Sequence, residues 1–256
     1  MGSFPGRRAS LPPDPPAFRD RAEAGVLRGA RLREVTGDDQ AGDPERVLAS
    51  ARALPVAPAP AGAPPVVFAI PRGGVAVAAG VARALGVPLD VLMVRKIGHP
   101  LAPELGLGAI AEDGAGGAAE PYFDAGMLGQ VGLAPGDLAE VVARERAELA
   151  RRVAVYARPA AAGENLEGRL VIVVDDGLAT GVTARAALRA VRARGAGRAV
   201  LAVPVAASVA LRAMEKETGE VVTLVTPRRF RSVGEWYADF GQLTDDDVLA
   251  LLSSGG

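Results

Sequence analysis

Residues 170–183, LVIVVDDGLATGVT, say most about the fold of this chain. The five apolar residues at 170–174 are typical of a strand that is buried on both faces of a parallel sheet. Two acids, Asp175 and Asp176, follow this strand directly, and a loop of small residues then leads into a helical pattern from Ala184. Because ligands of parallel sheets bind beyond the carboxyl ends of the strands, we expect a ligand site at these acids.

The loop after the acids has the composition of a phosphate site. Gly177 and Gly181 allow backbone conformations that other residues avoid, and they bring N–H groups close to an anion. Thr180 and Thr183 add hydroxyl donors, and the N-terminus of the following helix presents its positive end to the same place. The GxxxxGK[ST] pattern of a Walker loop is absent. The predicted phosphate loop consists of Gly177, Leu178, Ala179, Thr180, Gly181, Val182 and Thr183.

Two carboxylates beside a phosphate site would repel the ligand unless they also bind another part of it. Asp175 and Asp176 can accept hydrogen bonds from a cis-diol that lies a few ångströms from the phosphate. A 5-phosphoribosyl group has this layout. The alternative is purely structural: an acid that caps the helix of a strand–turn–helix unit.

The rest of the chain alternates strands with helices, as expected for a parallel sheet that is covered on both faces. We predict an α/β fold with a doubly wound, mostly parallel five-stranded sheet. Residues 97–123 are rich in Gly, Ala and Pro and lack a clear period, which predicts a long loop or a hairpin excursion. The expected strands are Val66–Ile70, Leu89–Val94, Leu170–Val174, Ala199–Val205 and Val221–Val225, and the expected helices are Val75–Leu85, Asp137–Tyr156, Ala184–Arg194 and Ser208–Glu217.

The N-terminal part differs in composition from this core. Residues 1–16 contain five prolines and one aromatic residue, which predicts a disordered tail. Residues 18–54 alternate charged with apolar positions and predict one or two short amphipathic helices, and residues 55–65 form a Pro/Ala linker. We therefore predict one domain over residues 17–256, with its core at about 66–226.

Composition excludes several classes of site. The chain has no cysteine, which removes disulfides, Cys-based metal sites and thiol nucleophiles, and His99 is its only histidine. The 29 Lys and Arg residues balance 30 Asp and Glu residues, which argues against a nucleic-acid partner. No apolar stretch is long enough to span a membrane, and residues 1–16 do not resemble a secretory signal, so we expect a cytoplasmic protein without a membrane partner.

The segment VIVVDDGLATGVT, residues 171–183, resembles the ribose 5-phosphate signature of the type I phosphoribosyltransferases. This resemblance covers about 18–252 and implies a small hood over the sheet edge, built from about 18–54 and 227–252, and a homodimer. Five more segments resemble a bacterial branch described as predicted phosphoribosyltransferases: FRDRAEAG (18–25), IPRGGV (70–75), DVLMVRKIGHP (90–100), GAIAEDG (108–114) and WYADF (236–240).

The resemblance implies a reaction. Such enzymes move the 5-phosphoribosyl group of 5-phosphoribosyl 1-diphosphate (PRPP) to a small-molecule acceptor and release diphosphate, with Mg2+ as cofactor. The catalytic need is electrostatic, since the leaving diphosphate must be neutralised and water excluded. We expect Asp175, Asp176, Arg95 and Lys96 to be catalytic, and we assign no direct protein ligand to the metal.

A second anion site is expected at the turn after the first strand. The resemblance implies that Arg72, Gly73 and Gly74 bind diphosphate, and glycines at a helix start free N–H groups for an anion. Arg95 and Lys96, at the end of the second strand, are assigned to the same diphosphate. The alternatives are a plain tight turn for the glycines and a solvated surface pair for the two cations.

The long excursion at 97–123 corresponds to a loop that closes over PRPP in this family. His99, Glu112 and Asp113 are candidate loop contacts to the substrate. The alternatives are a loop histidine without a role and a simple hairpin turn at 112–114.

The acceptor is less defined. Relatives that use oxopurines carry a third acid in the phosphate loop, and this chain has Ala179 there, which favours a pyrimidine-like base or another nucleophile. Trp236 and Tyr237 are candidates for stacking on the acceptor, although a packed cluster that anchors the hood is the favoured alternative. Residues 244–247 predict the N-cap of a helix at 248–252. A non-catalytic PRPP or nucleotide sensor and a PRPP hydrolase remain alternative functions.

Overall fold

The computed structural model describes residues 16–26, 65–156, 165–218 and 220–254. The predicted tail at 1–16, apart from Pro16, the linker at 55–65, apart from Pro65, and the predicted helices beyond residue 26 lie outside the described residues. Within the described part, no helix is long and apolar enough to cross a membrane.

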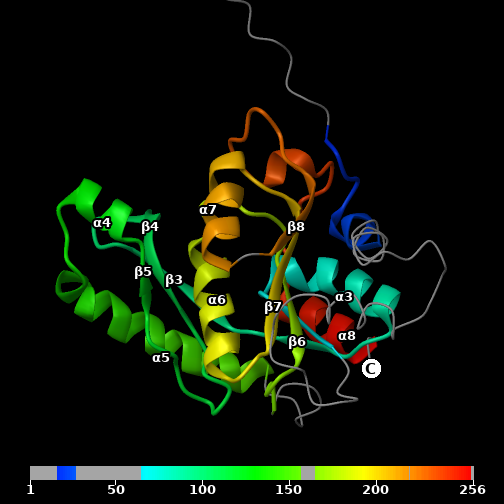
Figure 1. Cartoon of the computed structure of the whole chain (residues 1–256), viewed down its shortest axis with the longest axis horizontal. Coiled ribbons are helices and arrows are strands. Elements are labelled where there is room, and N and C mark those ends of the chain that lie inside the picture. The colour runs from blue at the N-terminus through cyan, green and yellow to red at the C-terminus, as the bar shows by residue number, and fades with distance from the viewer. Residues whose placement is uncertain (1–15, 27–64, 157–164, 219, 255–256) are drawn as a thin grey trace, which may run out of the picture.

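The centre of the molecule is a five-stranded, fully parallel sheet in the order β2-β1-β6-β7-β8 (Figure 1). The predicted α/β fold is therefore confirmed. The order reverses at β1, where the chain first adds a strand on one side and then returns to the other, so β1 and β6 flank a topological switch point. The strands are β1 (Val66–Ala69), β2 (Leu89–Val91), β6 (Leu170–Val174), β7 (Arg198–Val205) and β8 (Val221–Val225).

Helices cover both faces of this sheet, because alternate residues of its buried strands point to opposite sides. Val67 and Ala69 of β1 join the core beneath α3 (Gly73–Leu85) and α8 (Asp245–Ser254). Val66 and Phe68 join a separate core beneath α6 (Val182–Ala193) and α7 (Ser208–Thr218). The four helices predicted for the core are thus present, with ends that differ from the expected ones by up to two residues, and the helix predicted at 248–252 begins three residues earlier, at Asp245.

One predicted strand is wrong. Leu89–Val94 is not a single strand, because β2 ends at Val91 and β3 (Val94–His99) belongs to a different sheet. Leu92 and Met93, which join them, are fully buried and continue the apolar run without a break. An unbroken run does not reveal where a chain leaves one sheet for another.

The second sheet is antiparallel and has three strands, β3, β4 (Ala102–Ala111) and β5 (Tyr122–Phe123). It confirms the hairpin alternative for residues 97–123. One face packs on α6, and the other packs on α5 (Ala139–Tyr156), which follows α4 (Ala125–Val131) and a 3-10 turn at Pro135–Leu138 (Figure 1). Glycines in these strands remove the alternation of apolar and polar side chains that would have indicated a strand. The close backbone approach requires them: a Cβ on Gly98 would lie 2.3 Å from the carbonyl oxygen of Pro103 across the hairpin.

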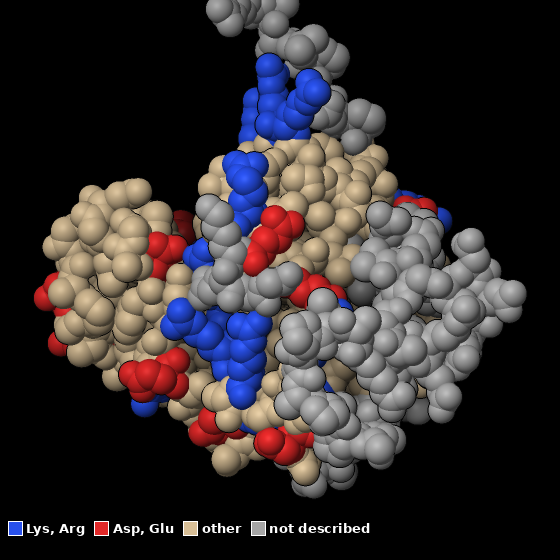
Figure 2. Space-filling view, viewed as in Figure 1, with Lys and Arg blue, Asp and Glu red and all other residues tan. Residues whose placement is uncertain are grey.

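Residues 16–26 and 227–244 together form the hood. The backbone of Ala238 donates to the carbonyl of Phe18 at 2.9 Å, and Asp239 donates to Arg19 at 2.8 Å. Residues 21–26 are helical. The loop after β8 exposes three arginines, Arg228, Arg229 and Arg231, and Figure 2 shows basic side chains projecting from this end of the molecule.

Candidate active site

The two acids lie at the carboxyl end of β6, in the middle of the sheet. Asp175 keeps β-type contact with β7, donating its N–H to Ala202 at 3.3 Å, and the Asp175 carboxylate accepts from the N–H of Asp176 at 2.9 Å. Both residues are half-buried. The pair therefore lies at the carboxyl end of a strand, as predicted, and the strand order places that strand beside the switch point of the sheet.

Asp176 is fixed on two sides by the hood. Its Oδ2 accepts from Nε of Arg21 at 2.9 Å, in an ion pair whose two side chains are 11% and 17% exposed. Its backbone carbonyl accepts from the hydroxyl of Tyr237 at 2.6 Å. The N-terminal and C-terminal segments of the hood thus meet at the same acid.

Burial dominates the acid–base behaviour of the pair. Burial and the charge of Asp176 raise the pKa of Asp175 well above its usual value. Burial also raises the pKa of Asp176, although the neighbouring Arg21 works in the opposite direction. Both carboxyl groups therefore resist ionisation more than an exposed aspartate does.

The turn at 70–74 packs directly on the acids. The N–H of Ile70 donates to the carbonyl of Val174 at 2.9 Å, which joins the ends of β1 and β6. A Cβ on Gly73 would lie 1.9 Å from Oδ2 of Asp176, and a Cβ on Gly74 would lie 2.7 Å from the Val174 carbonyl oxygen. A side chain at position 74 would therefore clash with backbone, and one at position 73 would have to displace the Asp176 carboxylate. The Pro71–Arg72 peptide before them is cis.

The loop at 177–183 opens to solvent beside the acids. Leu178 is buried and anchors the loop, since its N–H donates to Val205 and its carbonyl accepts from Ala207, both at 2.8 Å. Ala179 and Thr180 are exposed, and Gly181 has φ 81° at the N-cap of α6. The loop therefore presents the start of a helix to the space beside Asp175 and Asp176, as a phosphate site requires.

Arg72 lies on the same turn and pairs with a different acid. Its Nη1 is 3.7 Å from a carboxylate oxygen of Asp245, the first residue of α8. The same carboxylate accepts from the hydroxyl of Tyr156 at the end of α5. The turn thus joins α3, α5 and α8 through one exposed acid.

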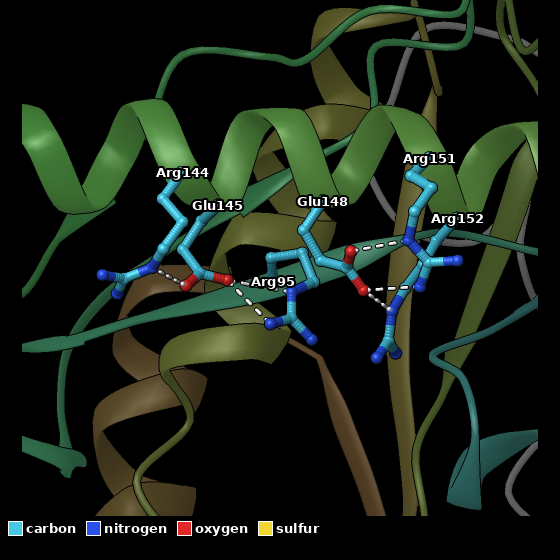
Figure 3. Close-up of polar contacts among 6 residues, drawn as sticks. All are labelled: Arg95, Arg144, Glu145, Glu148, Arg151 and Arg152. Atoms are coloured by element: carbon cyan, nitrogen blue, oxygen red, sulfur yellow. Dashed lines mark hydrogen bonds and ion pairs between the residues drawn. The ribbon is translucent and has the colours of Figure 1, made fainter.

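Arg95 and Lys96 are held on β3 by other partners. Arg95 donates to Oε2 of Glu145 on α5 through Nε at 3.0 Å and Nη2 at 2.7 Å, and Arg144 reaches the other oxygen at 3.3 Å (Figure 3). Glu145 is 8% exposed. Nζ of Lys96, which is exposed, donates across the hairpin to the carbonyl of Glu104 at 2.9 Å.

A second ion-pair group, Glu148 with Arg151 and Arg152, lies one turn further along α5 (Figure 3).

His99 lies at the end of β3, where its Nδ1 accepts from the backbone of Leu101 at 3.1 Å. It borders a hollow of about 270 Å3 between the hairpin and α5. The lining residues are Arg95, Lys96, Gly98, His99, Pro103, Arg144 and Glu145.

Glu112 and Asp113 are not brought to the acid pair. Asp113 accepts from the N–H groups of Ala115 and Gly117 at 2.8 and 2.9 Å, which forms the tight turn of the structural alternative. Glu112 interacts with Arg194, the residue that caps the C-terminal end of α6. The phosphate loop is at the opposite end of this 12-residue helix, about 18 Å away at 1.5 Å per residue.

Trp236 and Tyr237 are packed inside the hood. They are 7% and 4% exposed and share a small core with Phe18 and Ala24. The Tyr237 ring lies 5.4 Å from that of Phe18 and 5.2 Å from that of Phe240. This is the packed cluster that the sequence favoured over stacking on an acceptor.

Comparisons with known proteins decide the family. The model of the phosphoribosyl transferase domain matches residues 60–230, which include the acids, the turn and the phosphate loop. The chain belongs to this family. The sequence is 40% identical over 238 residues to two Mycobacterium tuberculosis proteins assigned in name to the phosphoribosyl transferases, MT0597 of strain CDC 1551 / Oshkosh and Rv0571c of strain H37Rv.

Each of these alignments covers 92% of this chain but 46% of the relative, so the chain spans about half the length of these relatives. Among solved structures, the crystal structure of TT1426 from Thermus thermophilus is similar, with 38% identity and a TM-score of 0.65. The match covers 93% of this chain and 98% of TT1426.

Two residues of the candidate site were missed from the sequence. Arg21 is 155 residues away from Asp176, and Glu145 is 50 residues away from Arg95. Arg21 lies in FRDRAEAG, a segment that carried the family resemblance, and this was the one signal that could have drawn attention to it. Glu145 lies four residues from both Val141 and Leu149, on the apolar face of α5, and this helical spacing was the signal that could have identified it.

Proposed function

We propose that this protein transfers the 5-phosphoribosyl group of PRPP to a small-molecule acceptor and releases diphosphate. The observation that carries the proposal is the packing of Asp175 and Asp176 between the turn at 70–74 and the loop at 177–183. Membership of the phosphoribosyl transferase domain family supports it.

Each part of this arrangement has a role in the proposed reaction. The loop at 177–183 binds the 5-phosphate through backbone N–H groups and the start of α6. Asp175 and Asp176 accept hydrogen bonds from the ribose hydroxyls. The N–H groups at Gly73 and Gly74 bind diphosphate, and the charges of Arg95 and Lys96 offset the negative charge that builds on this leaving group. The glycines let the turn lie against the acids, which keeps both ends of the substrate on one sheet edge.

Mg2+ fits these residues as an ion that arrives with the substrate. Within the described ranges, no group of three or more His, Cys, Asp or Glu side chains is placed to hold a metal by itself. Mg2+ needs few carboxylates when phosphate oxygens and water complete its shell. When bound, the ion would take its ligands from phosphate oxygens and water and would neutralise diphosphate, and no protein side chain is assigned as a direct ligand.

The acceptor is expected to be a pyrimidine-like base or another nucleophile. Ala179 is exposed at the loop position where a third acid would serve as proton acceptor for an oxopurine, and it carries no titratable group. The hood covers the same sheet edge and limits entry of water. We also propose a homodimer and a cytoplasmic location, which light scattering and cell fractionation would test.

Release of diphosphate from PRPP tests the proposal. Wild-type protein with Mg2+ should release diphosphate when the correct base or amine is added, and calorimetry should show PRPP binding.

The D175N/D176N double variant should lose PRPP binding while keeping its thermal unfolding midpoint. Asp246→Asn, which changes an exposed acid in the first turn of α8, serves as the control. Release without an acceptor would indicate a hydrolase, and binding without release would indicate a sensor. Unchanged binding by the double variant would refute the assignment of the acids.

A further inference from the structure

Arg21 connects three parts of the molecule with one guanidinium group. Its Nε donates to Oδ2 of Asp176 at 2.9 Å, and its Nη1 donates to the carbonyl of Gly241 at 2.7 Å. The centre of the guanidinium lies 3.7 Å from the centroid of the Phe240 ring. Segment 16–26, the end of β6 and the C-terminal part of the hood are therefore held together at this side chain.

Arg21 engages only one oxygen of Asp176. This oxygen, Oδ2, also faces Gly73, where a Cβ would come within 1.9 Å of it. The carboxylate is thus turned so that Oδ2 meets the hood and the 70–74 turn. A carboxylate can accept about four hydrogen bonds on its two oxygens, so Oδ1 keeps capacity for a ligand hydroxyl.

The charges around Asp176 oppose each other. The carboxylate of the adjacent Asp175 accepts a hydrogen bond from the backbone N–H of Asp176 and brings a negative charge close to it. Arg21 brings a positive charge through its ion pair with Asp176. Tyr237 contributes an uncharged hydroxyl bond to the Asp176 carbonyl. Burial raises the pKa of Asp176, and Arg21 is what lowers it.

We propose that Arg21 is a positioning residue of the sugar site, which pairs with the Asp176 carboxylate and turns it so that its other oxygen accepts a ribose hydroxyl. The inference rests on the proposed function, since it gives Asp176 the role of binding the ribose. The inference adds that the hood influences substrate binding through Arg21 and Asp176, besides covering the substrate.

The geometry requires arginine. A guanidinium has donors in a fixed planar fork and a flat face, and Arg21 uses two separate donors and the face at once. An ammonium can replace the charge at Asp176 but not the fork and the stacking together. Arg21→Lys should therefore retain part of the effect, and Arg21→Met, which keeps the length of the side chain, should retain none.

The test is PRPP affinity measured by calorimetry from pH 5.5 to pH 8.5 in the presence of Mg2+. For Arg21→Met we expect a loss of about tenfold or more at pH 6 relative to wild type, which shrinks as pH rises and Asp176 ionises without its partner. Arg19→Met is the matched control, because Arg19 lies in the same segment, has a side chain that is 73% exposed and, among the described residues, forms its ion pair with the neighbouring Asp20. Its profile should follow that of the wild type. A loss in Arg21→Met that is equal at every pH would indicate a merely structural role and would overturn the proposal.

Carboxyl 13C chemical shifts separate this inference from the proposed function. In the ligand-free protein, the Asp176 pKa should be higher in Arg21→Met than in wild type, and intermediate in Arg21→Lys. An unchanged value would overturn the inference even if PRPP binds. If wild-type protein binds no PRPP, the proposed function fails, and a raised Asp176 pKa in Arg21→Met would still support the action of Arg21 on this acid. Near-ultraviolet circular dichroism of each variant shows that the fold is retained.

Discussion

A Cβ atom on Gly73 would lie 1.9 Å from Oδ2 of Asp176, far inside van der Waals contact. The two anion-binding segments of the proposed site, which are about one hundred residues apart in sequence, therefore touch at a glycine and a carboxylate. A methyl group cannot be added at this point unless the carboxylate moves.

Gly73→Ala should weaken PRPP binding. The methyl group would push Asp176 out of line with Arg21, at a cost of about 1–3 kcal/mol in stability, the usual range for overpacking. Calorimetry and thermal unfolding check both effects. Gly129→Ala on α4 is the control, because nothing lies within 4 Å of its added Cβ. Equal PRPP affinity in the two variants would contradict the contact.

Arg95→Met should destabilise the fold more than Arg144→Met. Both arginines pair with Glu145, but the Arg95 side chain is 27% exposed and that of Arg144 is 67% exposed. Removing Arg95 leaves the buried Glu145 carboxylate without its closest cation, at a cost of about 1–3 kcal/mol in the free energy of unfolding. The more exposed pair with Arg144 contributes at most about 1 kcal/mol. Urea unfolding measures the difference, and the same loss in both variants would rule out this ranking.

Lys96→Ala should lower turnover more than PRPP binding. Its Nζ is exposed and contacts only the Glu104 carbonyl within the described structure, so the fold should not suffer. If its charge acts on departing diphosphate, the interaction strengthens in the transition state and kcat falls while Kd changes little. Kinetics and calorimetry on the same preparation test this. Matching losses in kcat and affinity would show that Lys96 contacts substrate uniformly.

Glu112 should make stability depend on pH. Burial raises its pKa to about 7, with Arg194 only partly offsetting the effect. Because the folded state then binds a proton that the unfolded chain has released, the free energy of unfolding falls as pH rises from about 4.5 to about 7, by on the order of 3 kcal/mol.

Glu112→Gln should flatten this part of the pH profile. Asp175 and Asp176 act with the same sign, so the informative quantity is the difference between variant and wild type in urea unfolding at pH 5, 6, 7 and 8. Glu140→Gln, an exposed acid in the first turn of α5, controls for the loss of one charge. Parallel profiles for Glu112→Gln and wild type would show that Glu112 is ionised normally in the fold.

The parallel sheet could be predicted because short, largely apolar runs alternate with helical patterns along the chain. The position of Asp175 and Asp176 followed from the same pattern, since they end the run at 170–174. The break at Leu92 and Met93 could not be predicted, because burial continues through the change of sheet. The strands of the second sheet were hidden because close backbone crossings require glycine where a strand would otherwise carry β-branched residues.

The candidate site divides in the same way. Local segments such as the 70–74 turn and the 177–183 loop carry their own glycines and could be located from the sequence. The partners of these segments depend on tertiary contacts: Arg21 with Asp176, Arg95 with Glu145 and Glu112 with Arg194 are each separated by 50 residues or more. No periodicity or motif in the sequence indicates which charged residues, distant along the chain, will pair in the fold.

The meeting of Arg21 with Asp176 and Gly241 also bears on how the molecule is completed during synthesis. Arg21 leaves the ribosome early, the acid follows 155 residues later, and the carbonyl that holds the other side of the guanidinium is 220 residues behind Arg21. A nascent chain halted before Tyr237 would carry both phosphate segments and the acids but not the hydroxyl that fixes the Asp176 backbone. Translation must therefore pass Gly241, close to the end of the described residues, before all three contacts can form.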